Sequence, residues 1–164
     1  MSYARFALMV ATSTVVMFVL MYLNSYVADH VWFSETRAWM ALVMGSSMAV
    51  IMLAFMVGMY TNRGANIAIV LGAGIAFAGA LWVVRTQATI SDIEYMKAMI
   101  PHHSIAILTS RRAHIRDPRV RELADQIIES QQREIAEMSE LIAALEANPT
   151  PTDAPDLPPL RSRQ

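Results

Sequence analysis

Three long segments without a charged residue occupy the first half of the chain, at residues 6–27, 38–60 and 65–84. A helix needs roughly 20 apolar residues to cross the hydrocarbon core of a bilayer, and each segment reaches that length. Because that core contains no water, the backbone polar groups of a spanning segment must bond to one another, which requires helices here. The pattern therefore predicts a transmembrane domain of three helices over residues 1–87.

The connections between these segments are short, at residues 28–37 and 61–64, so we expect consecutive helices to be antiparallel neighbours. The first segment is longer than the apolar run of a signal peptide, which is about 7–15 residues, and we expect it to be retained. The third segment is rich in glycine and alanine, which let helices approach closely in lipid. We expect these small residues to pack within the chain, with contact between copies as the alternative.

Charged residues make up 16% of the chain, against about 25% in soluble domains, and most of them follow Ser91. Near the predicted helix ends, Arg5 and Arg63 would lie on one side of the membrane. Arg37 and Arg85 would lie on the other, so the count of basic residues is a tie and leaves the orientation open. The absence of cysteine excludes disulfides and thiolate metal sites.

The charged second half has the pattern of a soluble helical hairpin over residues 88–147. Its first helix is expected at about residues 92–115, with a kink at Pro101, which lacks a backbone donor. Asp117 and Pro118 are typical of the start of the second helix, as N-cap and first helical residue.

Each predicted helix of the hairpin has one face that mixes apolar residues with potential metal ligands. On the first helix this face consists of Asp92, Met96, Met99, His103, Ile107, Ser110 and His114. On the second helix it consists of Val120, Leu123, Ile127, Gln131, Glu134, Met138, Leu141 and Leu145. Glu134 needs a partner there, because a carboxylate is rarely buried unless it is paired or binds a metal. An antiparallel hairpin would bring Glu134 and Met138 opposite His103.

The ligand types indicate which metal such a site would bind. Thioether sulfur and imidazole nitrogen together favour copper, particularly Cu(I), whereas imidazole with carboxylate would also suit zinc, iron or Cu(II). We therefore predict a copper site, with zinc and iron as the less favoured metals. The predicted ligands are Met96, Met99, His102, His103, Glu134 and Met138, with Asp92, Gln131 and His114 as possible supporting residues. The structural alternative is that the methionines fill the core and the histidines lie on the surface.

Two motifs in the hairpin resemble a bacterial family. The first, Met-Ile-Pro-His-His, covers residues 99–103, and the second, Gln-x-x-Glu-Ile-x-x-Met, covers residues 131–138. With the run Asp-Pro-Arg-Val-Arg-Glu-Leu-Ala from residue 117 between them, they make the hairpin similar to the domain-of-unknown-function family 305. The resemblance covers about a third of the chain and does not extend to the three apolar segments.

This resemblance implies a ferritin-like helical bundle that is exported to the periplasm or the cell surface. It also implies copper binding, since some relatives are rich in methionine and histidine and are linked to copper tolerance. Carried over residue by residue, the resemblance assigns the site to Met99, His102, His103, Glu134 and Met138. Typical members have a longer soluble domain, whereas this chain has a single hairpin.

A single hairpin of this length buries too little apolar surface to be stable alone. We expect it to pack against a second copy and complete a four-helix bundle, or against the membrane helices or another protein. The expected assembly is a homo-oligomer, most simply a dimer, in which a metal site could be shared between chains. The proline-rich tail, residues 148–164, is expected to be disordered.

Methionines recur at four-residue spacing in the second apolar segment, at Met40, Met44, Met48, Met52 and Met56. Flexible apolar filler is the favoured explanation. The alternative is a copper transporter, by analogy with the Ctr type, which also has three spans and a Met-x-x-x-Met in the second. This ladder drifts by about 40° per step around the helix, so its five sulfurs cannot line one straight pore.

The expected function is that of a non-enzymatic copper-binding protein of the bacterial inner membrane, with its C-terminal domain in the periplasm. The first alternative is an accessory or structural subunit of a larger membrane complex, and copper transport is the second. Di-iron chemistry in a ferritin-like bundle needs Glu-x-x-His pairs, and none follows Ser91. Five arginines in residues 111–121 would lie at the hairpin tip, where they fit lipid headgroups or a partner protein better than nucleic acid.

Overall fold

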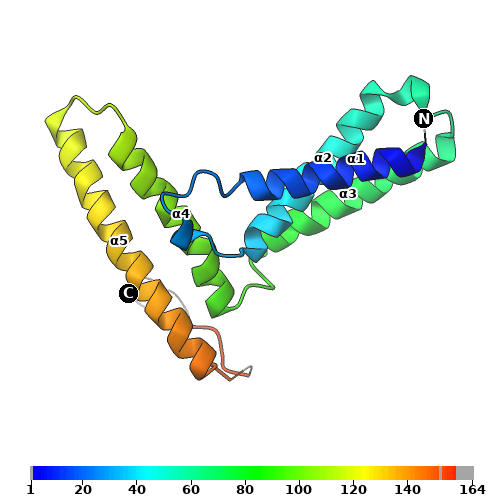
Figure 1. Cartoon of the computed structure of the whole chain (residues 1–164). Coiled ribbons are helices and arrows are strands. Elements are labelled where there is room, and N and C mark those ends of the chain that lie inside the picture. Colours follow the sequence, from blue (N-terminus) through cyan, green and yellow to red (C-terminus); the bar gives the residue numbers. More distant parts are fainter. Residues whose placement is uncertain (1, 152, 158–164) are drawn as a thin grey trace.

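The chain is all-α in the computed structural model, which describes residues 2–151 and 153–157. Its five helices are α1 (Tyr3–Leu20), α2 (Glu35–Phe55), α3 (Arg63–Thr86), α4 (Asp92–Arg112) and α5 (Pro118–Ala147). Two short 3-10 turns, η1 (Ala28–His30) and η2 (Val57–Met59), interrupt the connections. Helices α1 to α3 form one bundle, and α4 and α5 form an antiparallel hairpin that lies crosswise at its end (Figure 1). The prediction of a disordered tail falls partly on residues 152 and 158–164, which lie outside the described part.

Three helices are long and apolar enough to cross a membrane, as predicted, with mean hydropathies of 1.7, 2.0 and 2.4 over their most apolar stretches. The first is shorter than the uncharged segment 6–27, because α1 ends at Leu20 and the chain turns there. A lack of charge does not require a helix, and residues 21–27 instead enter a loop whose polar groups bond elsewhere. The second also departs from residues 38–60, since Ser34 caps α2 and the helix ends at Phe55.

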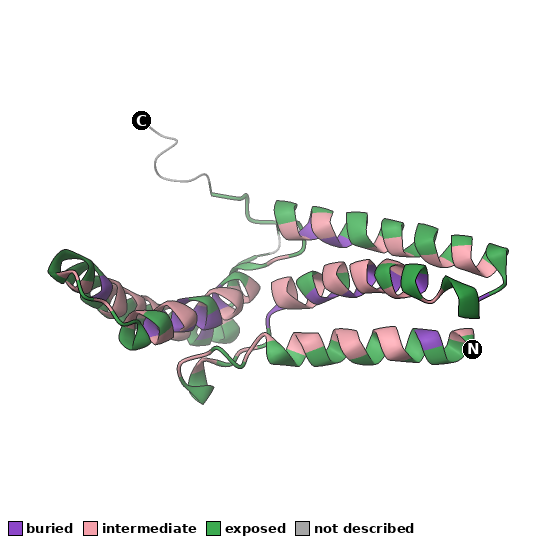
Figure 2. Cartoon of the chain, turned by 90° about the horizontal axis from the view of Figure 1, so that it is seen from above, coloured by how far each residue is buried: buried purple, intermediate pink, exposed green. Residues whose placement is uncertain are grey.

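Helix α2 lies between α1 and α3 (Figure 2) and contacts both. Its buried residues are mostly small, including Ala41, Gly45 and Ala49, which allow the neighbouring helices to approach closely. At the end of the bundle near the N-terminus, Phe6 and Tyr60 pack edge to face, with ring centroids 5.4 Å apart. These contacts hold the three helices as antiparallel neighbours, as the short connections predicted.

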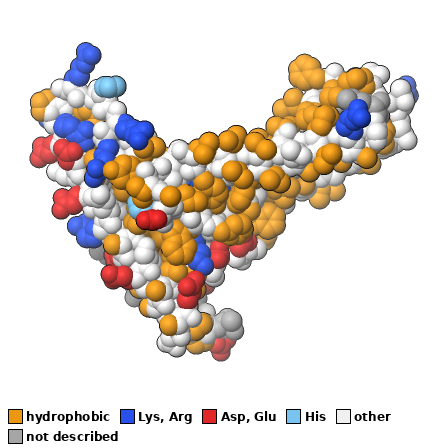
Figure 3. All heavy atoms as spheres, in the orientation of Figure 1, with side chains coloured by type: hydrophobic (Ala, Val, Ile, Leu, Met, Phe, Trp, Pro, Cys, Tyr) orange, Lys and Arg blue, Asp and Glu red, His pale blue; other side chains and the backbone are white. Residues whose placement is uncertain are grey.

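On the face of this bundle that Figure 3 shows, hydrophobic side chains extend along its length and charged ones are few. Large side chains such as Ile75, with an exposed fraction of 75%, project away from the protein. The glycines of α3 do not pack within the chain as expected, because a Cβ at Gly72, Gly74 or Gly79 would meet no atom within 4 Å. Among the small residues of α3, Ala80 is buried as expected, and the other close contacts come from the small residues of α2.

The hairpin has its own small core, which Met96, Ile100 and Ile107 of α4 form with Ile135 and Ile142 of α5. The predicted start of α5 is confirmed, because the Asp117 carboxylate accepts a hydrogen bond from the Arg119 backbone N–H and Pro118 is the first helical residue.

The predicted buried face of the second helix is only partly correct. Val120, Leu123 and Leu141 are exposed. Ala124, Ile135 and Ile142 are the buried residues of α5, so its buried face is rotated from the predicted stripe. Contact with α4 instead follows isoleucines at seven-residue spacing, namely Ile128, Ile135 and Ile142.

The connection between α1 and α2 packs onto the hairpin and joins the two parts of the molecule. The Ser104 hydroxyl of α4 accepts a hydrogen bond from the Tyr26 backbone N–H at 2.7 Å and lies 2.9 Å from His30 Nδ1. Tyr26 and Trp32 both pack against the hairpin core, and the Lys97 ammonium lies over the Trp32 ring. Residues 21–34, which we call the docking loop, therefore fix the hairpin against the bundle.

We predict that docking of this loop depends on pH through His30. Burial lowers the pKa of His30 below its usual value, while Asp29 opposes this shift. The neutral imidazole can accept a hydrogen bond from the Ser104 hydroxyl at Nδ1, and protonation of Nδ1 removes that acceptor. Because the undocked state binds the proton more readily, docking is fully stable above about pH 6.5 and weakens as the pH falls below it. Hydrogen exchange of the Tyr26 amide should accelerate accordingly, relative to a His30→Gln variant.

The matched control for this prediction is His114→Gln, which removes an exposed histidine of the loop between α4 and α5. This variant should keep the pH dependence of the wild type. An unchanged pH profile in His30→Gln would contradict the assignment to His30.

A second prediction concerns the close contact between α1 and α2. A Cβ at Gly45 would collide with the Thr14 side chain, whose hydroxyl is bonded to the Val10 carbonyl. Gly45→Ala should therefore lower the free energy of unfolding by about 1–3 kcal/mol relative to Gly72→Ala, which meets open space. Both substitutions gain the same helix propensity, so chemical unfolding of the two variants in detergent isolates the collision. Equal stabilities would show that Thr14 yields without cost.

Candidate metal centre

His103 lies in the middle of α4 on the side that faces α5, with an exposed fraction of only 8%. Helix α4 is assigned without a break from Asp92 to Arg112, so Pro101 does not end it. Pro101 is itself fully buried, and its missing N–H leaves the Lys97 carbonyl without its usual helical donor. This continuous helix holds the histidine backbone in place between the hairpin core and the docking loop.

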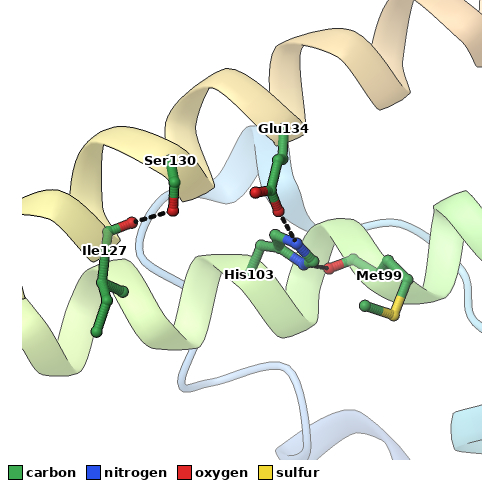
Figure 4. Close-up of polar contacts among 5 residues, drawn as sticks. All are labelled: Met99, His103, Ile127, Ser130 and Glu134. Carbon is green, nitrogen blue, oxygen red and sulfur yellow. Dashed lines mark hydrogen bonds and ion pairs between the residues drawn. The ribbon is translucent and has the colours of Figure 1, made fainter. Parts of the chain in front are cut away.

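Both ring nitrogens of His103 have a partner (Figure 4). Nδ1 lies 2.9 Å from the Met99 carbonyl oxygen, one helical turn earlier, and Nε2 lies 2.7 Å from Oε2 of Glu134 on α5. A carbonyl oxygen can only accept, so Nδ1 carries a proton and donates it. Nε2 faces the carboxylate. The hydrogen-bonding proton between these two atoms occupies the position that a cation could take.

Glu134 is the polar side chain of α5 that reaches this histidine. Ser130, one turn earlier on the same helix, donates its hydroxyl to the Ile127 carbonyl instead (Figure 4). The Glu134 side chain has an exposed fraction of 45%, against 10% for His103, so the pair lies at the edge of the hairpin with its carboxylate partly in water. The carboxylate is thus open to solvent, whereas the imidazole is held by the core.

The methionines predicted as ligands occupy different surroundings. Met96 is buried in the hairpin core, and Met138 packs against the same core. Met99 contributes its backbone carbonyl to the site, while its thioether is directed away from Glu134 (Figure 4). The structure thus brings His103 and Glu134 together, and the ring nitrogens of His103 bond to the Met99 carbonyl and to Glu134 rather than to a methionine sulfur.

The remaining predicted residues lie around the pair or outside it. The exposed His102 ring stands beside that of His103, with centroids 6.3 Å apart. Gln131 is half-buried one turn before Glu134. Asp92 is exposed at the start of α4, and His114 is exposed in the loop beyond it, so neither adjoins the pair.

The described residues include no group of three or more histidine, aspartate or glutamate side chains that could hold a metal ion. The His103–Glu134 pair supplies two donors, whereas zinc and similar ions take four. For tetrahedral bonds of roughly 2.0–2.1 Å, the two donor atoms would stand about 3.3 Å apart. The observed separation of 2.7 Å would have to open by a few tenths of an ångström, which a partly exposed glutamate can allow.

Sequence reasoning missed the residues on the far side of α4. Ser104, His30 and the Tyr26 backbone form a polar contact directly behind His103. Nothing in the spacing of these residues links positions so far apart in the chain. The one available signal is a serine beside His103 on a face that would otherwise be apolar.

The family comparison concerns the C-terminal part of the chain, which contains this hairpin. Residues 85–158 match a family model described as "Domain of unknown function (DUF305)". A protein of Acanthamoeba polyphaga mimivirus, described as uncharacterized protein L153, is 47% identical over 64 residues, which are 38% of this chain and 42% of that protein. The chain thus covers less than half the length of this relative. No solved structure matches. The hairpin with the His103–Glu134 pair is therefore the part of the chain that matches the family model.

Proposed function

We propose that this chain is a membrane-anchored metal-binding protein that handles copper through His103 and Glu134. The observation that carries the proposal is the geometry of the histidine, whose Nδ1–H is held by the Met99 carbonyl while Nε2 faces a carboxylate. A backbone carbonyl bonded to one ring nitrogen is the usual way in which proteins orient a metal-binding imidazole through its other nitrogen.

The choice of copper rests on the sulfur atoms around the pair. Met96 and Met138 pack in the same core, and the half-buried Met99 has a flexible side chain that a rotamer change would reorient. Thioether and imidazole donors favour Cu(I), while imidazole and carboxylate also suit Cu(II) and zinc. Copper is the metal for which all three donor types are suitable in one or other oxidation state.

A second copy of the chain would complete the site. One hairpin offers two nitrogen or oxygen donors, and a dimer that pairs two hairpins would offer four. The exposed Leu141 on α5 is available for such a contact. The resulting four-helix bundle would be ferritin-like, as the family resemblance implies, and the metal would lie between two copies.

The proposed location is the bacterial inner membrane, with the hairpin in the periplasm. Three helices apolar enough to cross a membrane support the membrane anchor. The resemblance to an exported family supports a periplasmic position for the hairpin. No enzymatic step is proposed. The methionines of α2 do not favour transport, because Met52 and Met56 pack against the Phe6–Tyr60 cluster and Met40 lies on the outer surface.

The second candidate function is an accessory subunit of a larger membrane complex. The docking loop favours it, because contacts such as Tyr26–Ser104 hold the hairpin in one position relative to the bundle. A hairpin fixed in this way is a suitable docking module and needs no metal ion for that role. Metal binding therefore distinguishes the two functions.

Titration of the full-length protein with Cu(I), Cu(II) and Zn(II) in detergent tests the metal site directly. The wild type should bind copper stoichiometrically, and His103→Ala should abolish this binding because it removes the oriented imidazole. His114→Ala, which removes an exposed histidine of the loop between the helices, is the matched control and should bind as the wild type does. A wild type that binds none of the three ions would favour the accessory subunit.

Substitutions at Glu134 separate a structural role from a metal-binding one. Without metal, Glu134→Ala should lower the free energy of unfolding by about 1–3 kcal/mol, because the buried His103 loses its partner. Glu134→Gln keeps a hydrogen-bonding group and should lose less. Copper at 100 times its Kd should stabilise the wild type by about 2.7 kcal/mol in thermal unfolding and stabilise Glu134→Gln much less. Equal stabilisation of both proteins would exclude Glu134 as a ligand.

A further inference from the structure

The tip of the hairpin carries the strongest local charge of the molecule. Residues 111–123 contain five arginines, one aspartate and one glutamate, a formal charge of +3 with His114 neutral, although the whole chain has a net charge of -1. Blue side chains gather at this end of the hairpin in the space-filling view (Figure 3). The proposed metal site makes no use of this cluster.

Only part of this charge is neutralised within the chain. Arg119 forms an ion pair with Asp117 at 2.8 Å, and Arg121 with Asp125 at 2.6 Å. The ion pairs between described residues include neither Arg112 nor Arg116, and both side chains are exposed. Two guanidinium groups at the tip are thus available to an anionic partner.

The position of the tip determines which anionic surface it can meet. The hairpin lies crosswise at the end of the apolar bundle, and its tip projects beyond the bundle to one side (Figure 1). With α1 to α3 across a bilayer, the projecting tip faces the lipid surface beside the bundle. The Arg111 guanidinium lies 5.1 Å from the centroid of the Tyr26 ring, which belongs to the docking loop between the tip and the bundle.

Apolar side chains accompany the charges. Val120 and Leu123, on the first turns of α5, have exposed fractions of 50% and 56%. Exposed aliphatic groups beside arginines are typical of segments that lie in the interfacial region of a bilayer, where the apolar groups enter the headgroup boundary and the cations meet phosphates.

We propose that the hairpin tip binds the headgroups of anionic phospholipids in the leaflet on its own side of the membrane. Arg112 and Arg116 supply the charge, Val120 and Leu123 the apolar contact, and the docking loop holds the tip at the required height. This contact is separate from the metal site, because it involves neither His103 nor Glu134. It rests on α1 to α3 crossing the bilayer and holds for either orientation of the chain.

A fluorophore on the tip can test this contact. The chain contains no cysteine, so a single cysteine introduced at the tip can be labelled selectively. The full-length His114→Cys protein is labelled and placed in nanodiscs that contain a fixed fraction of a lipid with a quencher on its headgroup. The host lipid is phosphatidylcholine alone or phosphatidylcholine with phosphatidylglycerol. Quenching should increase with phosphatidylglycerol and should decrease at high salt, since the screening length falls from about 10 Å at 0.1 M to about 3 Å at 1 M.

Charge variants identify the groups responsible. Arg112→Gln and Arg116→Gln should each weaken the tip–lipid association about fivefold, the usual contribution of one basic residue near an anionic surface. Arg133→Gln is the matched control, because it removes an exposed arginine from the middle of α5 and should change nothing.

Three results would overturn the proposal. Quenching that does not respond to phosphatidylglycerol or salt would mean that anionic headgroups are not bound. Equal losses in Arg112→Gln and Arg133→Gln would mean that only the overall charge matters. No quenching in any bilayer would mean that the tip projects into water, where a partner protein would be its ligand.

Discussion

The hydroxyl of Ser104 is the contact on which the arrangement of the two parts depends. It accepts the Tyr26 backbone N–H and meets His30 Nδ1, so it gives polar groups of the docking loop the partners that burial requires. Together with the Thr89–Glu35 hydrogen bond and the packing of Tyr26 and Trp32, this contact holds the apolar bundle and the charged hairpin in one arrangement. The position of the hairpin tip relative to the bundle follows from it.

The two faces of α4 have different roles, one in contact with the docking loop and the other in the proposed metal site. One face receives the docking loop at Ser104, and the other directs His103 toward Glu134 on α5. Ser104 and His103 are adjacent in the chain and both are buried. A shift of the docking loop at Ser104 would therefore displace His103 as well, because a packed interior transmits such shifts. The proposed metal site and the docking of the loop are therefore mechanically adjacent, although they share no side chain.

The tip and the middle of the hairpin differ in charge and therefore suit different partners. Its tip is basic and partly apolar, whereas the pair of His103 and Glu134 lies at mid-length with its carboxylate toward solvent. An anionic surface meets the tip without contact with the pair. The proposed lipid contact would orient the hairpin rather than take part in metal binding.

The sequence by itself determined the elements of this protein. Uncharged segments identified three apolar helices, and Asp117 with Pro118 identified the start of α5, because these signals act through local backbone chemistry. It also predicted the opposition of His103 and Glu134, since an antiparallel hairpin fixes that register. Only the tertiary structure decided that residues 21–34 leave the helix and dock on Ser104, and that the Met99 carbonyl rather than its thioether contacts the histidine. These contacts depend on the approach of distant segments and on side-chain rotamers, which no spacing along one helix encodes.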